Sequence, residues 1–129
     1  MGETLIPDEV QAFLLQHIDS IAQLEALLLL HADPTFTWNA EKLAKRLYIS
    51  AEETAAVLEH LAAHGFLTTP PDLPDSYRYH PASSEVAHMV DQVAELYAKY
   101  LIPITHLIHS KPRTRVQEFA DAFKLRKGD

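Results

Sequence analysis

Hydrophobic residues in the middle of the chain recur with the period of an α-helix in two consecutive segments. The first segment has apolar residues at positions i, i+3, i+4 and i+7, which lie on one face of a helix: Ala40, Leu43, Ala44 and Leu47. Asn39 precedes this segment and is a suitable side-chain cap. Ser50 opens the second segment with Glu53 three residues later, the pattern of a capping box, and Gly65 is a C-terminal cap. The spacing predicts two helices joined by a short turn.

Residues with strand-forming side chains follow the second predicted helix. Phe66–Thr68 and Tyr77–His80 have the β-branched and aromatic content of short strands. The loop between them is filled by turn-forming residues: Pro70, Pro71, Asp72, Pro74 and Asp75. Phe36–Trp38 is a candidate for a third short strand beside this hairpin. The order therefore predicts a helix-turn-helix followed by a hairpin wing, with Trp38 packed under the wing.

Further helices are predicted on both sides of this central segment. Pro7 and Asp8 start a helix through about His17, and Ser20 with Gln23 caps a strongly apolar helix that ends near His31. After the wing, a long helix begins at Ser83 or Ser84, Pro103 kinks or splits it, Pro112 ends it, and a last helix covers about Arg113 to Leu125. We expect a mainly α fold with an N-terminal helix (1–19), a winged helix-turn-helix domain (20–82) and a C-terminal helical arm with a basic tail (83–129).

Residues 20–80 resemble the winged-helix transcriptional regulators of bacteria, in the broad sense that includes the MarR-like and PadR-like families. The resemblance lies in the order helix, turn, helix, wing and in the ending formed by Leu61, Gly65, Phe66 and Leu67. It implies a winged-helix fold and a regulatory protein, and winged helices most often bind DNA, although some bind only protein. Helices that flank the winged domain in these families commonly pair across a two-fold axis, so the resemblance also implies a homodimer.

Composition excludes several other classes of protein. A chain of 129 residues with 47% hydrophobic residues fits one compact domain, and the absence of cysteine excludes disulfides and thiolate metal sites. The N-terminus has no basic start of a signal peptide, and the apolar run 26–30 is far shorter than a membrane span. Only three glycines are present, no phosphate-binding loop occurs and no nucleophile lies in a known motif. We expect a cytoplasmic protein that is not an enzyme and has no cofactor.

Charge distribution conflicts with simple DNA binding. Residues 1–110 carry five Lys and Arg against fifteen Asp and Glu, a net charge of −10, whereas residues 111–129 carry six against three, a net charge of +3. Nonspecific affinity for DNA comes mainly from cations that neutralise phosphates. The exposed face expected for the second helix has no Lys or Arg and carries Glu52, Glu53 and Glu59. These carboxylates would repel phosphate, so base-specific readout by this helix is in doubt.

The candidate DNA-binding residues are therefore few. They are Lys42, Lys45 and Arg46 on the first helix of the pair, His60 on the second and Arg78 in the wing strand. Pairing with Glu41 and neighbouring acids on a solvated helix face is an equally good interpretation of the first three. The basic tail has three interpretations: contact with the DNA backbone, contact with an acidic surface of a second subunit or another protein, and favourable placement of cations at a helix C-terminus. Its cations are Lys111, Arg113, Arg115, Lys124, Arg126 and Lys127.

The predicted C-terminal helix carries an apolar stripe with approximate heptad spacing. The candidate dimer-interface residues are Val86, Met89, Val93, Leu96, Tyr100 and Leu107, with Phe119 and Phe123 as an extension of the same interface. The alternative is that the stripe packs on the chain's own domain. Two histidine pairs with helical spacing, His60/His64 and His106/His109, match no strong metal-ligand pattern, so we expect no metal site. Protonation of the histidines below about pH 6.5 would reduce the negative charge, so we expect partner affinity to rise there.

Two functional hypotheses from different classes follow, and we expect the first, because the resemblance of the fold favours it, with the second as the alternative. The first is a homodimeric winged-helix transcriptional regulator that binds DNA. The second is a winged-helix protein interaction module whose acidic helix meets a basic protein surface and does not bind DNA.

Overall fold

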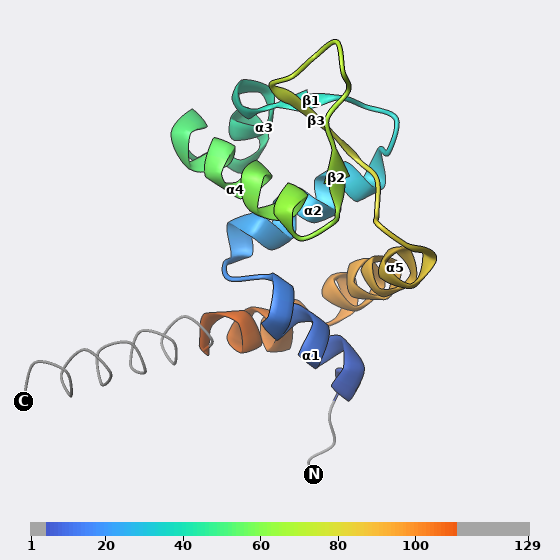
Figure 1. Cartoon of the computed structure of the whole chain (residues 1–129). Coiled ribbons are helices and arrows are strands. Elements are labelled where there is room, and N and C mark those ends of the chain that lie inside the picture. The colour runs from blue at the N-terminus through green and yellow to red at the C-terminus, as the bar shows by residue number, and fades with distance from the viewer. Residues whose placement is uncertain (1–4, 111–129) are drawn as a thin grey trace, which may run out of the picture.

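The computed structural model describes residues 5–110 and shows a helical protein with a small antiparallel sheet (Figure 1). The elements in order are α1 (Asp8–His17), α2 (Ile21–Ala32), β1 (Trp38–Asn39), α3 (Ala40–Leu47), α4 (Ala51–Ala63), β2 (Leu67–Thr68), β3 (Ser76–Tyr79) and α5 (Ser84–Lys99), and residues 101–110 are also helical. The strand order is β1-β3-β2, with Trp38 opposite Tyr77 and Leu67 opposite Tyr79. The chain is a winged helix, as the sequence predicts.

The predicted helix caps are present and fix the geometry of the helix-turn-helix. The Asn39 side chain accepts a hydrogen bond from the Lys42 amide at 2.8 Å. Ser50 and Glu53 form a reciprocal capping box at the start of α4. Gly65 has a φ of +87°, and the Phe66 amide donates to the Leu61 carbonyl at 3.1 Å, the bonding expected of a Schellman ending. Local sequence therefore defines both ends of α4.

One hydrophobic core connects the winged-helix elements to the flanking helices. α2 lies at its centre, with Leu24, Leu27 and Leu30 completely buried, and it contacts α3, α4, α5 and β3. Trp38 is buried under the wing as expected. None of the described helices is long and apolar enough to span a membrane alone. α1 and α2 taken together have the length and composition of a membrane span, but they meet at a bend of 106°.

The predicted long C-terminal helix is split near Pro103. α5 ends at Lys99, Tyr100 leaves helical geometry with φ −126° and ψ 54°, and a new helix begins at residue 101. Pro103 therefore lies in the first turn of the new helix, where its missing N–H leaves no intrahelical bond unmade. Because of this break, Val86 and Leu107 do not belong to one continuous heptad seam. The predicted end at Pro112 and the predicted helix 113–125 lie outside the described residues.

The apolar stripe of α5 packs mainly on the chain's own domain. Val93 is completely buried, and Val86, Met89, Leu96 and Leu107 are partly buried against the same core. α5 contacts α1 and α2, which cover this stripe. Tyr100 is half-buried at the break. For Val93 the structure therefore agrees with the alternative interpretation, in which the stripe packs on the chain's own domain. A completely buried Val93 side chain cannot contact a second subunit. Phe119 and Phe123 lie outside the described residues.

Candidate functional site

α4 presents a buried apolar face and an exposed acidic face. Thr54, Val57, Leu58 and Leu61 are buried, as expected from their spacing. The Thr54 hydroxyl donates to the Ser50 carbonyl at 2.8 Å, which satisfies the buried polar group of that side chain. The exposed positions of α4 are Ala51, Glu52, Glu53, Ala56, Glu59 and Ala63. None of them carries a donor suited to a phosphate or a guanine edge.

The wing adds carboxylates to the same surface. Asp72 and Asp75 are exposed in the loop between β2 and β3, and no Lys or Arg lies in that loop. Arg78 lies on β3, where it pairs with Thr68 across the sheet. Its side chain is half-buried, and its Nε is buried without a hydrogen-bond partner among the described residues. Arg78 is therefore a wing-strand residue whose guanidinium is partly withdrawn from solvent.

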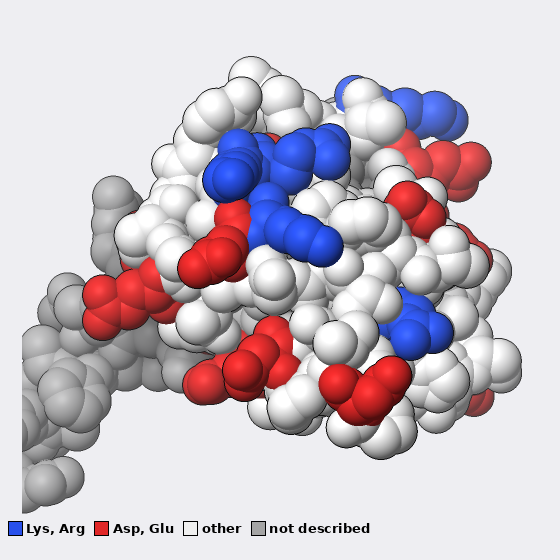
Figure 2. All heavy atoms as spheres, turned by 90° about the horizontal axis from the view of Figure 1, so that it is seen from above, with Lys and Arg blue, Asp and Glu red and all other residues white. Residues whose placement is uncertain are grey.

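Three candidate DNA-binding cations lie together on α3. Lys42, Lys45 and Arg46 are exposed, and Figure 2 shows a gathered group of basic side chains with acidic side chains beside it, and acidic and further basic side chains elsewhere on that face. The Lys42 Nζ lies 5.5 Å from the centre of the Phe36 ring, and the Arg46 guanidinium lies 5.8 Å from the centre of the Trp38 ring. Both cations thus contact aromatic rings of their own domain.

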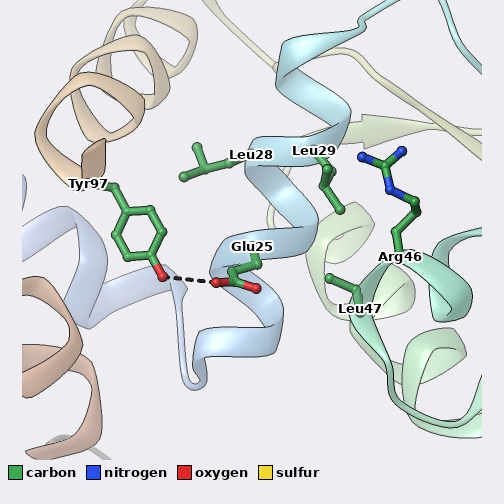
Figure 3. A pocket seen from close by; sticks show the side chains of 6 residues that line it. All are labelled: Glu25, Leu28, Leu29, Arg46, Leu47 and Tyr97. Carbon is green, nitrogen blue, oxygen red and sulfur yellow. Dashed lines mark hydrogen bonds between the residues drawn. The ribbon is translucent and has the colours of Figure 1, made fainter. Parts of the chain in front are cut away.

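Arg46 also borders a hollow between α2, α3 and α5 (Figure 3). The hollow has a volume of about 290 Å³ and is lined by Glu25, Leu28, Leu29, Arg46, Leu47 and Tyr97. The Tyr97 hydroxyl donates to a Glu25 carboxylate oxygen at 3.1 Å. Burial, followed by this hydrogen bond and the Glu25 charge, raises the pKa of Tyr97 to about 12. Glu25, the carboxylate among the described residues that line the hollow, therefore already has a hydrogen-bond donor.

A second cavity, of about 270 Å³, lies between the start of α3, the exposed side of α4 and the wing. Its lining consists of Ala40, Ala55, Leu58, Glu59, Asp75 and Tyr77. Glu59 comes from α4 and Asp75 from the wing, so two segments 16 positions apart bring two carboxylates to one cavity. Sequence reasoning named both acids separately but did not join them, because only the approach of the wing to α4 places them together.

His60, the remaining candidate for DNA contact, lies in the last turn of α4 and bonds to α1 instead. Its Nε2 lies 2.7 Å from the His17 carbonyl oxygen, and because a carbonyl only accepts, Nε2 carries the proton. Nδ1 of His17 lies 2.9 Å from Nδ1 of His64, and the His60 and His64 rings are 4.2 Å apart. Within residues 5–110, no group of three or more His, Cys, Asp or Glu is arranged to hold a metal ion. These contacts make His60 part of the packing between α1 and α4.

Tyr48, in the turn between α3 and α4, is a residue that the hydrophobic pattern of the sequence does not single out. Its side chain is 92% exposed, and its backbone lies in the left-handed region with φ 59° and ψ 39°. It is the one non-glycine residue with positive φ in the part of the chain that the structure describes. A bulky aromatic residue in this conformation is strained, and its exposed ring gives little packing in return.

Known proteins resemble this chain only distantly. The sequence matches no family model and no curated protein. Among solved structures it is similar to the multiple antibiotic-resistance repressor (MarR) from Listeria monocytogenes 4b F2365, with 18% sequence identity and a TM-score of 0.49. The alignment covers 93% of this chain and 80% of that chain. A similarity this distant supports no argument about the present chain, so function has to be argued from the side chains.

Proposed function

We propose that this winged helix is a regulatory interaction module that docks a basic segment of another protein on the surface formed by α4 and the wing. We call this the α4–wing surface; its exposed carboxylates belong to Glu52, Glu53, Glu59, Asp72 and Asp75. The observation that carries the proposal is the absence of any Lys or Arg from α4 and the wing loop. A surface of this charge repels phosphate and attracts Lys and Arg side chains.

The rest of the surface suits a protein partner. Leu73 at the wing and Tyr48 beside α4 are large, exposed apolar or aromatic side chains. Exposed aromatic residues are common anchors in protein interfaces, and surrounding charges steer the partner and fix its orientation. Glu53 also forms the capping box of α4 with Ser50, so substitutions that test the surface should leave Glu53 unchanged.

The test is fluorescence anisotropy of a labelled peptide of alternating lysine and alanine, titrated with the full chain at low salt. A surface variant removes four carboxylates: Glu52→Gln, Glu59→Gln, Asp72→Asn and Asp75→Asn. A control variant has the same net charge but changes exposed acids elsewhere: Asp8→Asn, Glu9→Gln, Glu85→Gln and Glu95→Gln. We expect the surface variant to bind on the order of a hundredfold more weakly and the control to bind like the wild type. An equal loss of peptide affinity in both variants would show that the peptide responds only to the net charge of the chain, and would refute the proposal.

DNA binding as a transcriptional regulator is the second candidate function, and the grouping of cations on α3 favours it. The winged-helix fold is used mainly for DNA, although fold alone does not decide function. Binding of a random duplex that weakens steeply with salt and disappears in a variant with Lys42→Ala, Lys45→Ala and Arg46→Ala would establish phosphate contact by α3. Absence of duplex binding at low salt favours the interaction module.

A homodimer is the third element of the proposal, with an interface formed by residues other than Val93. Because Val93 is buried in the chain's own core, Val93→Asp would unfold the chain and cannot test dimerisation. Large apolar residues remain exposed outside the winged domain at Leu5, Leu15, Leu101 and Ile102. We expect light scattering to show a dimer that a variant with Leu101→Asp and Ile102→Asp converts to a folded monomer. A wild-type chain that is monomeric at high concentration would contradict this.

A further inference from the structure

The cavity between α3, α4 and the wing has an apolar floor and an acidic rim. Leu58 is completely buried beneath it, and Ala40 and Ala55 are half-buried on its walls. Glu59 and Asp75 are exposed, and the half-buried Tyr77 ring completes the lining. Apolar atoms thus lie inside and negative charge lies at the mouth.

Both rim carboxylates are without a charged partner inside the described part of the chain. Glu59 and Asp75 make no side-chain hydrogen bond and no ion pair there. The other hollow differs in this respect, because its Glu25 accepts a hydrogen bond from Tyr97 and its wall includes the cation Arg46. Of these two hollows, only the one beside the wing combines unpaired negative charge with the absence of a resident cation.

The size of the cavity indicates what kind of group it admits. Pockets for drug-sized ligands commonly measure about 300–1,000 Å³, and this cavity, at about 270 Å³, is slightly smaller. A Lys or Arg side chain has an apolar stem that lies along apolar surface and a charged head that needs a polar partner. The alanine and leucine walls match the stem, the two carboxylates match the head, and an aromatic ring such as Tyr77 attracts the same cation.

We propose that this cavity receives one Lys or Arg side chain of the partner protein, with its stem on Ala55 and Leu58 and its cation between Glu59 and Asp75. This inference rests on the proposed function, since it names one anchoring point on the α4–wing surface. The remaining carboxylates of that surface then steer the basic segment, and the cavity sets its register.

The test uses two matched pairs of single variants and the same labelled lysine–alanine peptide with the full chain. Ala55→Leu fills the cavity without a change of charge, and Ala56→Leu places the same side chain on the next residue of α4, which is exposed and does not line the cavity. Asp75→Asn removes a rim carboxylate, and Asp72→Asn removes a carboxylate of the same loop outside the lining. Thermal melts followed by circular dichroism establish that each variant is folded.

We expect Ala55→Leu and Asp75→Asn to weaken peptide binding about tenfold and their controls to change it about twofold or less. If each cavity variant binds like its control while the four-carboxylate surface variant loses binding, the surface docks the peptide and the cavity inference is wrong. If the surface variant binds like the wild type, the proposed function itself is wrong. Should Ala55→Leu fail to fold, the Asp75→Asn and Asp72→Asn pair alone decides, because both positions are exposed loop residues.

Discussion

Replacement of Tyr48 by glycine should stabilise the folded chain, although it deletes a large aromatic side chain. A non-glycine residue in the left-handed region costs about 1–2 kcal/mol, and Tyr48 lies there with φ 59°. Glycine removes this cost but loses about 0.5–1 kcal/mol more backbone entropy on folding. The ring is 92% exposed, so its removal forfeits little buried surface. The amide of residue 48, which donates to the Ala44 carbonyl at 2.8 Å, is kept.

The net expectation for Tyr48→Gly is a gain of about 0.5–1 kcal/mol, or a rise in Tm of about 2–4 °C for a chain of this size. The assay is thermal unfolding by circular dichroism, together with urea unfolding to check that the slope is unchanged. Ala56→Gly is the matched control, because it places glycine at an exposed position inside α4 and should destabilise by about 1 kcal/mol. A Tm below that of the wild type for Tyr48→Gly would refute the strain argument and show that the ring supports the fold.

Three further predictions test the core, a cap and the hydrogen bond between Tyr97 and Glu25. Phe66→Ala should destabilise the chain by about 3–5 kcal/mol in urea unfolding, because Phe66 is completely buried and packs edge-on against Phe13; a loss under about 1 kcal/mol would contradict the packing. Ser50→Ala should lower the free energy of unfolding by about 1 kcal/mol in the same assay, because the capping box is lost. Ser50→Thr keeps the hydroxyl and should retain most of that stability. Glu25→Gln should bring the pKa of Tyr97 below its value of about 12 but keep it above 10, because burial, the largest cause, remains; ultraviolet titration of phenolate, with the Tyr97→Phe variant as reference, measures this. Since the folded pKa of Tyr97 exceeds its unfolded value of 10, its contribution to stability is complete below pH 10 and is lost as the pH rises towards 12.

Local chemistry made much of the fold predictable from sequence. Asn39, Ser50 with Glu53, and Gly65 each act within a few residues of their own position, so their caps follow from spacing alone. The buried face of α4 follows from its periodicity for the same reason. The sequence predicted that the helix breaks near Pro103 but did not predict at which residue. The break lies at Tyr100 because the Pro103 ring clashes with the preceding turn of a continuous helix.

The candidate site was less predictable because it depends on contacts between distant segments. The stripe around Val93 has the same spacing whether it meets a second copy or the chain's own α1 and α2, and only the fold distinguishes the two. His60 has the right helical position for an exposed face, but the approach of α1 gives it a carbonyl partner. The cavity between Glu59 and Asp75 exists only because the wing folds back beside α4. The predicted domain boundaries and the role of the basic tail remain predictions.

The most direct test of the account is a paired anisotropy titration in one low-salt buffer, with the full chain titrated into labelled lysine–alanine peptide and, separately, into labelled random duplex DNA. Docking on the α4–wing surface predicts peptide binding that the four-carboxylate surface variant loses and the charge-matched control retains, with no duplex binding. Duplex binding that disappears with Lys42→Ala, Lys45→Ala and Arg46→Ala, together with peptide binding that the surface variant does not weaken, would contradict it and establish α3 as a DNA-binding element.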